Sequence, residues 1–201
     1  MSSITEICNL ALSHLGVGTP ISNIQTEKTE EAQACGLNYE FALGFMLRTY
    51  HWPFFSKTIN LALVEEDPTI EWGYSYRVPN DCARLVRLIS GQTFDTPETR
   101  IKYVISHDDS GLLIYTNQPN AQAEYVINDP DPRFFPFDFT LALSYKLATL
   151  IAPRVTGGDV FKITERCNTL FDRHVSRALA TSQNESNPYT NDESGFERCR
   201  R

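Results

Sequence analysis

Long hydrophobic runs, a basic excess and a signal-peptide pattern are all missing from this sequence. No apolar run reaches the roughly 18 to 20 residues of a membrane span, and the first residues lack the basic and then apolar order of a signal peptide. Acidic residues outnumber basic residues by 25 to 18, which gives a formal net charge of −7. Proteins that grip nucleic acid usually carry a basic excess that neutralises phosphates. We therefore expect neither a membrane protein nor a tight nucleic-acid binder.

Cysteine motifs are also missing. The five cysteines are odd in number, widely spaced and without a C-x-x-C pair: Cys8, Cys35, Cys82, Cys167 and Cys199. Disulfide frameworks and zinc sites use even sets or close pairs. The pattern predicts reduced, mostly packed thiols in a protein made in a reducing cytosol, with no metal ion and no other cofactor.

Known catalytic motifs do not occur either. The sequence contains no G-x-S-x-G, H-E-x-x-H, Walker or G-x-G-x-x-G pattern. His107, Asp108 and Asp109 can be drawn as a cation site, but Asp, Ser and Gly are what a solvated turn needs. Asp129 and Asp131 are interpreted as turn and helix-cap residues rather than paired acid–base carboxylates. No nucleophile, base and orienting group stand out, so we expect a protein that is not an enzyme.

The other histidines are given structural places. His14 lies near the end of the first helical segment, and His51 sits in a Tyr-His-Trp-Pro corner. His174 falls on an apolar helical stripe, which is typical of a half-buried imidazole with a hydrogen-bond partner.

Periodicity and charge divide the 201 residues at the same borders. Residues 1–55 and 131–182 have helical spacing, whereas residues 56–130 alternate and contain regular turn signals. Residues 56–130 carry 6 bases and 11 acids, and residues 131–182 reverse the sign with 7 bases and 5 acids. A chain of this length forms one domain or a body with an insert. We predict an α+β fold with a four-helix bundle body (1–55 and 131–182) and an inserted antiparallel β domain (56–130), either a sandwich or a small barrel.

Capping residues predict the helix starts. Ser3 and Glu6 form a capping box for the first helix, and Thr26 or Thr29 begins a second helix that runs to about Tyr50. One apolar stripe is expected along that second helix, formed by Ala34, Leu37, Phe41, Ala42, Phe45 and Met46. Strands are expected at 59–63, 74–78, 85–89, 101–105, 112–116 and 123–127.

The second half of the body is expected to hold two further helices. One carries Phe139, Leu143, Leu147 and Ile151 on its inner face and ends at Pro153. The last spans 157–182, with Asp159 as its cap.

A basic stripe follows that last helix. It comprises Lys162, Arg166, Arg173 and Arg177, which fall within about 60° of arc at helical spacing. A solvated helix flank is one interpretation. The other is an intersubunit contact with an acidic surface, for which the β segment of a neighbouring copy, at net −5 from 6 bases and 11 acids, is the candidate. Direct DNA binding ranks third, because four bases on an acidic chain grip phosphates poorly.

Residues 183–201 change character and are predicted to form a flexible C-terminal tail, too poor in apolar residues to fold alone. Aromatic residues and arginines, the types enriched at interface hot spots, punctuate the tail: Tyr189, Phe196, Arg198, Arg200 and Arg201. We expect these residues to dock on a partner or neighbouring subunit. The alternative is a loose end with no task.

Four stretches of the sequence carry a family resemblance. They read "ICNLALSHLGVGTPISNI", "LRTYHWPFF", "YSYRVPNDCARLVRLI" and "IYTNQPNAQAEYVINDPDPRFFPFDFTLALSYKLATLIAPRVTG". The last two are the most specific, with a Tyr-x-x-Pro-x-Asp-Cys corner and a strand–Asp-Pro–Phe–helix junction. Together they resemble the tail tubular protein A family of short-tailed phages, the head-to-tail adaptors also called connectors or gatekeepers. The resemblance covers about residues 4–180.

The resemblance implies a virion structural protein without catalytic residues. Such adaptors form rings of about twelve copies between the capsid portal and the tail nozzle, with the helical body on the portal and the β insert toward the nozzle. Double-stranded DNA passes through the lumen without specific binding, which an acidic subunit suits. The implied place is the tail or neck of the virion, after synthesis in the host bacterial cytoplasm.

Two alternatives stay open. One is a small virion-associated hydrolase that degrades cell wall, with a site built from scattered His and Asp residues. The other is a connector of another phage tail type. A buried, mutually bonded His–carboxylate pair in a cleft favours the enzyme, and acidic-to-basic contacts between chains favour the ring.

Overall fold

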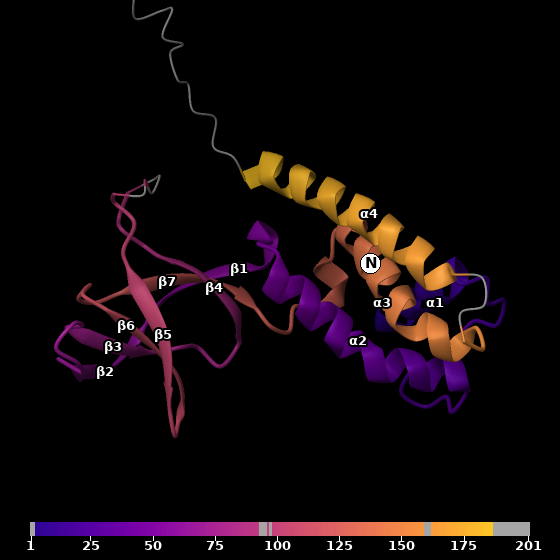
Figure 1. Ribbon diagram of the computed structural model, residues 1–201, viewed down its shortest axis with the longest axis horizontal. Helices are drawn as coiled ribbons and strands as arrows, with labels where there is room; N and C mark the ends of the chain where they lie inside the picture. The colour runs from indigo at the N-terminus through magenta and orange to yellow at the C-terminus, as the bar shows by residue number, and fades with distance from the viewer. Residues whose placement is uncertain (1–2, 93–95, 97, 159–161, 187–201) are drawn as a thin grey trace, which may run out of the picture.

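The computed structural model describes residues 3–92, 96, 98–158 and 162–186. Over these residues the chain has the predicted α+β fold, with helices and antiparallel strands in separate regions (Figure 1). The helices are α1 (Ile4–His14), α2 (Glu30–Thr49), α3 (Phe137–Val155) and α4 (Ile163–Ser186), with the short 3-10 helices η1 (Pro53–Phe55) and η2 (Pro132–Phe134). The strands are β1 (Ser56–Asn60), β2 (Ala62–Glu66), β3 (Tyr74–Arg77), β4 (Cys82–Leu88), β5 (Tyr103–Asp108), β6 (Gly111–Thr116) and β7 (Gln122–Ile127). Below, α1–α4 are called the helical body and β1–β7 the β insert.

Side-chain caps fix where α1 and α2 begin. The Ser3 hydroxyl accepts a hydrogen bond from the Glu6 backbone N–H at 3.2 Å, and the Glu6 carboxylate accepts one from Ser3 N–H at 2.8 Å. The predicted capping box is therefore confirmed. Of the two candidate starts for the second helix, Thr29 is the cap, because its hydroxyl accepts from Ala32 N–H.

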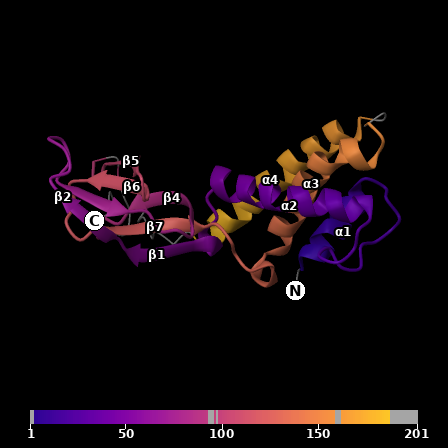
Figure 2. The ribbon, with the colours of Figure 1, turned by 90° about the horizontal axis from the view of Figure 1, so that it is seen from below.

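Helix α3 is the centre of the helical body and packs against α1, α2 and α4. Its predicted inner face is confirmed by the complete burial of Phe139, Leu143, Leu147 and Ile151. The helix does not end at Pro153 but continues to Val155, since a proline in the last turn removes a single helical hydrogen bond. Figure 2 shows the helices gathered at one end of an elongated molecule and the strands at the other.

Helix α4 is shifted along the chain relative to the prediction. It runs from Ile163 to Ser186 instead of over 157–182. Gly157, Gly158 and Lys162 have positive φ angles of 69°, 104° and 53°, a backbone conformation that no regular helix accepts. Asp159, the expected cap, lies outside the described residues. Residues 183–186 belong to the helix, and the rest of the predicted tail, 187–201, also lies outside the described residues.

The strands form two antiparallel sheets with the orders β1-β7-β4 and β2-β3-β6-β5. Both sheets contribute to one buried cluster: Leu61, Tyr76, Val78, Leu85, Leu88, Ile114, Ala121, Ala123 and Tyr125. The single strand expected at 59–63 is instead broken at Leu61, whose N–H donates to the Ala121 carbonyl at 2.9 Å. The chain uses this buried residue to cross from the first sheet to the second.

An aromatic cluster joins the helical body to the β insert. Phe55 of η1 meets Phe135 and Phe139 with ring centroids 5.3 and 5.1 Å apart. Trp52 is completely buried, lies edge-on to Phe139 at 5.0 Å and donates its indole N–H to the Met46 carbonyl at 3.0 Å. Edge-to-face rings stabilise such a cluster beyond their burial. The two segments that connect the helical body to the β insert, one before β1 and one after β7, therefore both pack against α3.

Candidate assembly surfaces

Helix α2 presents large apolar side chains to solvent. Leu37, Phe41 and Phe45 are 64, 75 and 41 % exposed and follow one another at four-residue intervals along one side of the helix. We call these three residues the α2 stripe. The single apolar stripe expected for this helix is in fact two faces, because the core takes a different side, formed by Ala34, Cys35, Tyr39, Ala42, Leu43, Met46 and Leu47.

A cation lies at one end of the α2 stripe. The Lys146 ammonium group of α3 sits 3.9 Å from the ring centroid of Phe45 and 5.2 Å from that of Phe171 on α4. Burial lowers the pKa of Lys146, while the nearby Asp172 carboxylate opposes that shift. The stripe therefore combines exposed apolar area with a positively charged rim, a composition that suits contact with another protein surface.

The predicted basic stripe is shorter on the structure than in the sequence. Arg166, Arg173 and Arg177 are exposed on α4, whereas Lys162 precedes the helix. Within the described residues, no hydrogen bond or ion pair of their side chains holds the three guanidinium groups. Their role in contacts between subunits stays a prediction.

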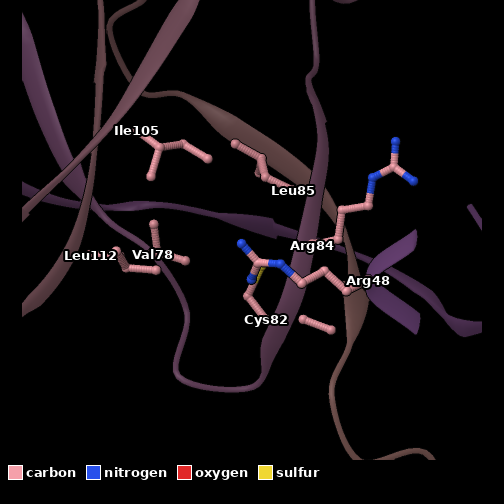
Figure 3. Close-up of a pocket in the computed structure, with 8 residues that line it drawn as sticks. Arg48, Val78, Cys82, Arg84, Leu85, Ile105 and Leu112 are labelled. Atoms are coloured by element: carbon pink, nitrogen blue, oxygen red, sulfur yellow. The ribbon is translucent and has the colours of Figure 1, made fainter. Parts of the chain in front are cut away.

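A pocket of about 360 Å³ opens in the β insert beside the end of α2. Its apolar wall includes Cys82 and Leu85 of β4, Ile105 of β5, Leu112 of β6 and Val78, which directly follows β3. We call this hollow the insert pocket. Figure 3 shows the Arg48 guanidinium pointing inward toward Cys82 and Val78, whereas the Arg84 guanidinium points away from the apolar wall. Arg84 instead donates to the Thr49 carbonyl at 3.1 Å.

Two predicted histidines are brought together in the helical body. The rings of His14, Tyr145 and His174 form a stack, with centroids 3.8 and 5.0 Å apart and nearly parallel planes. Ser144 donates its hydroxyl to the Leu141 carbonyl, so its oxygen accepts from His14 Nε2–H at 3.0 Å. Burial lowers the pKa of both histidines; His174 lowers that of His14 further, and Arg177 that of His174. The stack links α1, α3 and α4. His174 is half-buried as predicted, but within the described residues its ring is held by stacking on Tyr145 and not by the expected hydrogen bond.

A third histidine, His51, lies near a serine and a carboxylate that were not singled out in the sequence. His51 Nε2 is 3.2 Å from Ser56 Oγ and 3.9 Å from a Glu124 carboxylate oxygen. Ser56 donates to the Trp52 carbonyl and accepts from His51, and Arg87 holds Glu124 at 2.7 Å. A nucleophilic triad needs the base and the carboxylate on opposite ring nitrogens, but here both neighbours face the same nitrogen. Pairing of β1 with β7 brings Ser56 close to Glu124. Their spacing in the sequence does not indicate this proximity.

Two of the aspartates singled out in the sequence, Asp108 and Asp131, form the turn and cap hydrogen bonds predicted for such residues, and Asp108 also forms an ion pair that was not predicted. Asp108 forms two hydrogen bonds with the Arg77 guanidinium, at 2.6 and 2.8 Å, which lower the pKa of its carboxyl group to about 2. Asp108 also accepts from Ser110 N–H in the β5–β6 turn. Asp131 caps η2 by accepting from Arg133 N–H. Within the described residues, no three His, Cys, Asp or Glu side chains gather as a metal ion requires.

Comparison with known proteins leaves the family open. No model of a known protein family matches the chain, and no curated protein matches its sequence. Among the described residues, no helix combines the length and the apolar character needed to cross a membrane. The surfaces described above are therefore the basis for any functional assignment.

The proposed docking residues of the tail lie outside the described residues. They are Tyr189, Phe196, Arg198, Arg200 and Arg201. Cys8, Cys35 and Cys167 are buried thiols, and Cys82 is half-buried. Cys199, like the docking residues, lies outside the described residues. The α2 stripe and the insert pocket are the surfaces that sequence reasoning missed. The sequence did contain a signal for the α2 stripe, because α2 carries two separate rows of apolar residues at four-residue spacing.

Proposed function

We propose that this protein is a head-to-tail adaptor of a phage virion, assembled as a ring of about twelve copies between the portal and the tail nozzle. The observation that carries the proposal is the exposure of large apolar side chains on two different parts of one subunit. The helical body exposes the α2 stripe, and the β insert exposes Ile105 and Leu112, each about half, at the rim of the insert pocket.

Two unlike contact faces are what a ring subunit requires. In a cyclic assembly each copy uses one face toward the preceding copy and another toward the next. Exposed apolar patches of this kind are otherwise a liability for a soluble monomer. In a ring they are buried at every joint.

The division into body and insert fits a joint between two partners. In this proposal α1–α4 act as one four-helix bundle that packs on the portal and on neighbouring copies, and the β insert faces the nozzle. The segment 187–201 docks on the portal or an adjacent copy through its aromatic residues and arginines. The −7 charge suits a channel that duplex DNA crosses without being held.

The test is electron microscopy of the portal protein from the same virus, incubated with the purified full-length chain. We expect side views with an added layer and end views with a closed ring. Phe41→Ser on the α2 stripe should weaken ring formation about tenfold, because it removes a large apolar contact without touching the core. Glu40→Ser, at the neighbouring exposed position, is the matched control and should leave assembly unchanged.

Each outcome bears on a separate part of the proposal. Portals that gain no added layer from the wild-type chain contradict the adaptor function. Rings that form equally well with Phe41→Ser and Glu40→Ser contradict the role of the α2 stripe.

A further inference from the structure

A tight turn at the tip of the β2–β3 hairpin presents one apolar and one acidic side chain. The Trp72 N–H donates to the Thr69 carbonyl at 3.3 Å, which places Ile70 and Glu71 at the centre of the turn. Ile70 is fully exposed. The Glu71 carboxylate is exposed too and has no hydrogen bond or ion pair within the described part of the chain. Residues 62–76 carry four acidic residues and no basic residue. The tip of the hairpin is therefore an acidic surface on which Ile70 is exposed.

The turn is held in shape before any partner arrives. The Asp67 N–H donates to the Gly73 carbonyl at 2.8 Å and closes the loop at its base. Asn117 accepts from Gly73 N–H at 2.7 Å and donates to the Glu71 carbonyl at 3.4 Å. A preformed loop loses little conformational entropy on binding, which favours its use as a docking element.

The insert pocket has the complementary chemistry. Ile105 and Leu112 at its rim are 50 and 49 % exposed, so they offer apolar area that the subunit itself leaves open. Arg48 points into the pocket (Figure 3), and within the described residues its guanidinium has no hydrogen bond or ion pair. The volume of about 360 Å³ exceeds that of a single isoleucine side chain and leaves room for the turn around it.

The turn and the pocket of one copy cannot meet each other. The β2–β3 turn precedes Tyr74 at the start of β3, whereas Val78 of the pocket follows Arg77 at the end of that strand. They therefore lie at opposite ends of β3.

We propose that the β2–β3 turn of one copy docks into the insert pocket of the next copy, with Ile70 against Ile105 and Leu112 and Glu71 paired with Arg48. The contact joins two different surfaces, so it is head-to-tail and closes into a ring when its rotation permits. This inference rests on the proposed ring and assigns the partner of the insert pocket; the α2 stripe then contacts the portal or the helical body of a neighbouring copy.

A charge swap tests the pairing in the full-length chain bound to portals and in sedimentation of the free chain at raised concentration. Glu71→Lys places two cations together and should weaken association at least about tenfold, as should Arg48→Glu. The chain carrying both substitutions should recover most of the association. Asp109→Lys makes the same charge change at an exposed position of the β5–β6 turn and is the matched control.

Cross-linking reports the contact directly. One population carries Ile70→Cys and a second, tagged population carries Leu112→Cys, both with Cys199→Ser. The remaining thiols are buried or weakly reactive, since burial and Asp81 raise the pKa of Cys82 to about 11. A short thiol cross-linker should join the two populations. Ser110→Cys mixed with Leu112→Cys should give no such product.

The outcomes separate this joint from the proposed function. Rings that form normally with Glu71→Lys, or a double variant that fails to recover, overturn the joint while the adaptor function stands. Sensitivity to Arg48→Glu without sensitivity to Glu71→Lys also overturns it and assigns the pocket to another acidic partner. Specific Ile70–Leu112 cross-links in a chain that adds no ring to portals support the joint and contradict the adaptor function.

Discussion

The helical body has a larger buried core than the β insert, although both expose apolar side chains. In the body, α3 is enclosed by the other three helices, and its inner face is completely buried. In the insert, β2 is exposed at all five positions and β5 at four of its six. Burial of apolar area is the main source of folding free energy, so the body has the means to be the stable part. The insert keeps apolar area, including Leu63 and Val64, available for contact.

A substitution at the junction between the helical body and the β insert should destabilise the protein most. Trp52→Ala should lower the free energy of unfolding by about 3 to 5 kcal/mol, because it leaves a cavity in the aromatic cluster that holds body and insert together. Denaturant unfolding followed by fluorescence and circular dichroism measures the loss. Phe137→Ala, at an 86 % exposed position, is the control and should change stability by no more than about 0.5 kcal/mol. Equal losses in both variants contradict a stabilising junction.

A core substitution inside the insert tests whether the β insert unfolds separately from the helical body. Ile114→Ala removes a fully buried side chain shared by the two sheets and should cost about 2 to 5 kcal/mol locally. Hydrogen exchange should then show lost protection across β3, β5 and β6 while α3 stays protected. Loss of protection in α3 to the same extent indicates that body and insert unfold as one unit.

Acidification should act on the body through its histidine stack. The pKa values of His14 and His174 are lowered below the ordinary 6.5, by burial first and then by neighbouring positive charge. Below pH 6.5 the unfolded chain therefore binds more protons at these histidines than the folded chain does. The free energy of unfolding is highest above pH 6.5 and decreases as the pH is lowered below that value. His174→Phe keeps a ring on Tyr145 but does not titrate, so its unfolding free energy should fall less steeply between pH 7 and 5. The control is His107→Gln, at an exposed position of β5. Its free energy of unfolding should decrease between pH 7 and 5 as steeply as that of the wild type.

The smallest effect is expected at the ion pair on the surface of the insert. Asp108→Asn removes one partner of Arg77 and should lower the free energy of unfolding at neutral pH only slightly, because solvent screens this ion pair. The folded carboxyl group has a pKa of about 2 against an ordinary 3.8, so its contribution is present above pH 3.8 and is lost as the pH falls toward 2. Thermal unfolding at several pH values measures this, with Asp109→Asn as the control. A shift as large as that of Ile114→Ala contradicts a solvated ion pair.

Much of the fold follows from local signals in the sequence. The Ser3–Glu6 capping box and the α3 periodicity act within a few residues, so the chain shows them without tertiary information. The predicted ends of the strands were less accurate. Leu61 separates β1 from β2, because its N–H donates to the Ala121 carbonyl, which is far away in the sequence. The start of α4 was also missed, since the backbone conformation of Lys162 has no signature in its residue type.

The contact surfaces were harder to predict than the fold. Whether Phe41 faces core or solvent depends on which side of α2 meets α3, and both sides are apolar. The insert pocket joins Arg48 of a helix to Ile105 and Leu112 of two strands far along the chain. Such long-range proximity comes from topology and leaves no spacing to detect.

Native mass spectrometry of the purified chain mixed with its portal counts the copies that the two contact faces assemble. We expect a single complex whose added mass equals a closed ring of many copies per portal, about twelve by the resemblance, with Phe41→Ser reducing its abundance. A complex holding one copy per portal, or a chain that stays separate from the portal at every concentration, contradicts the proposed ring.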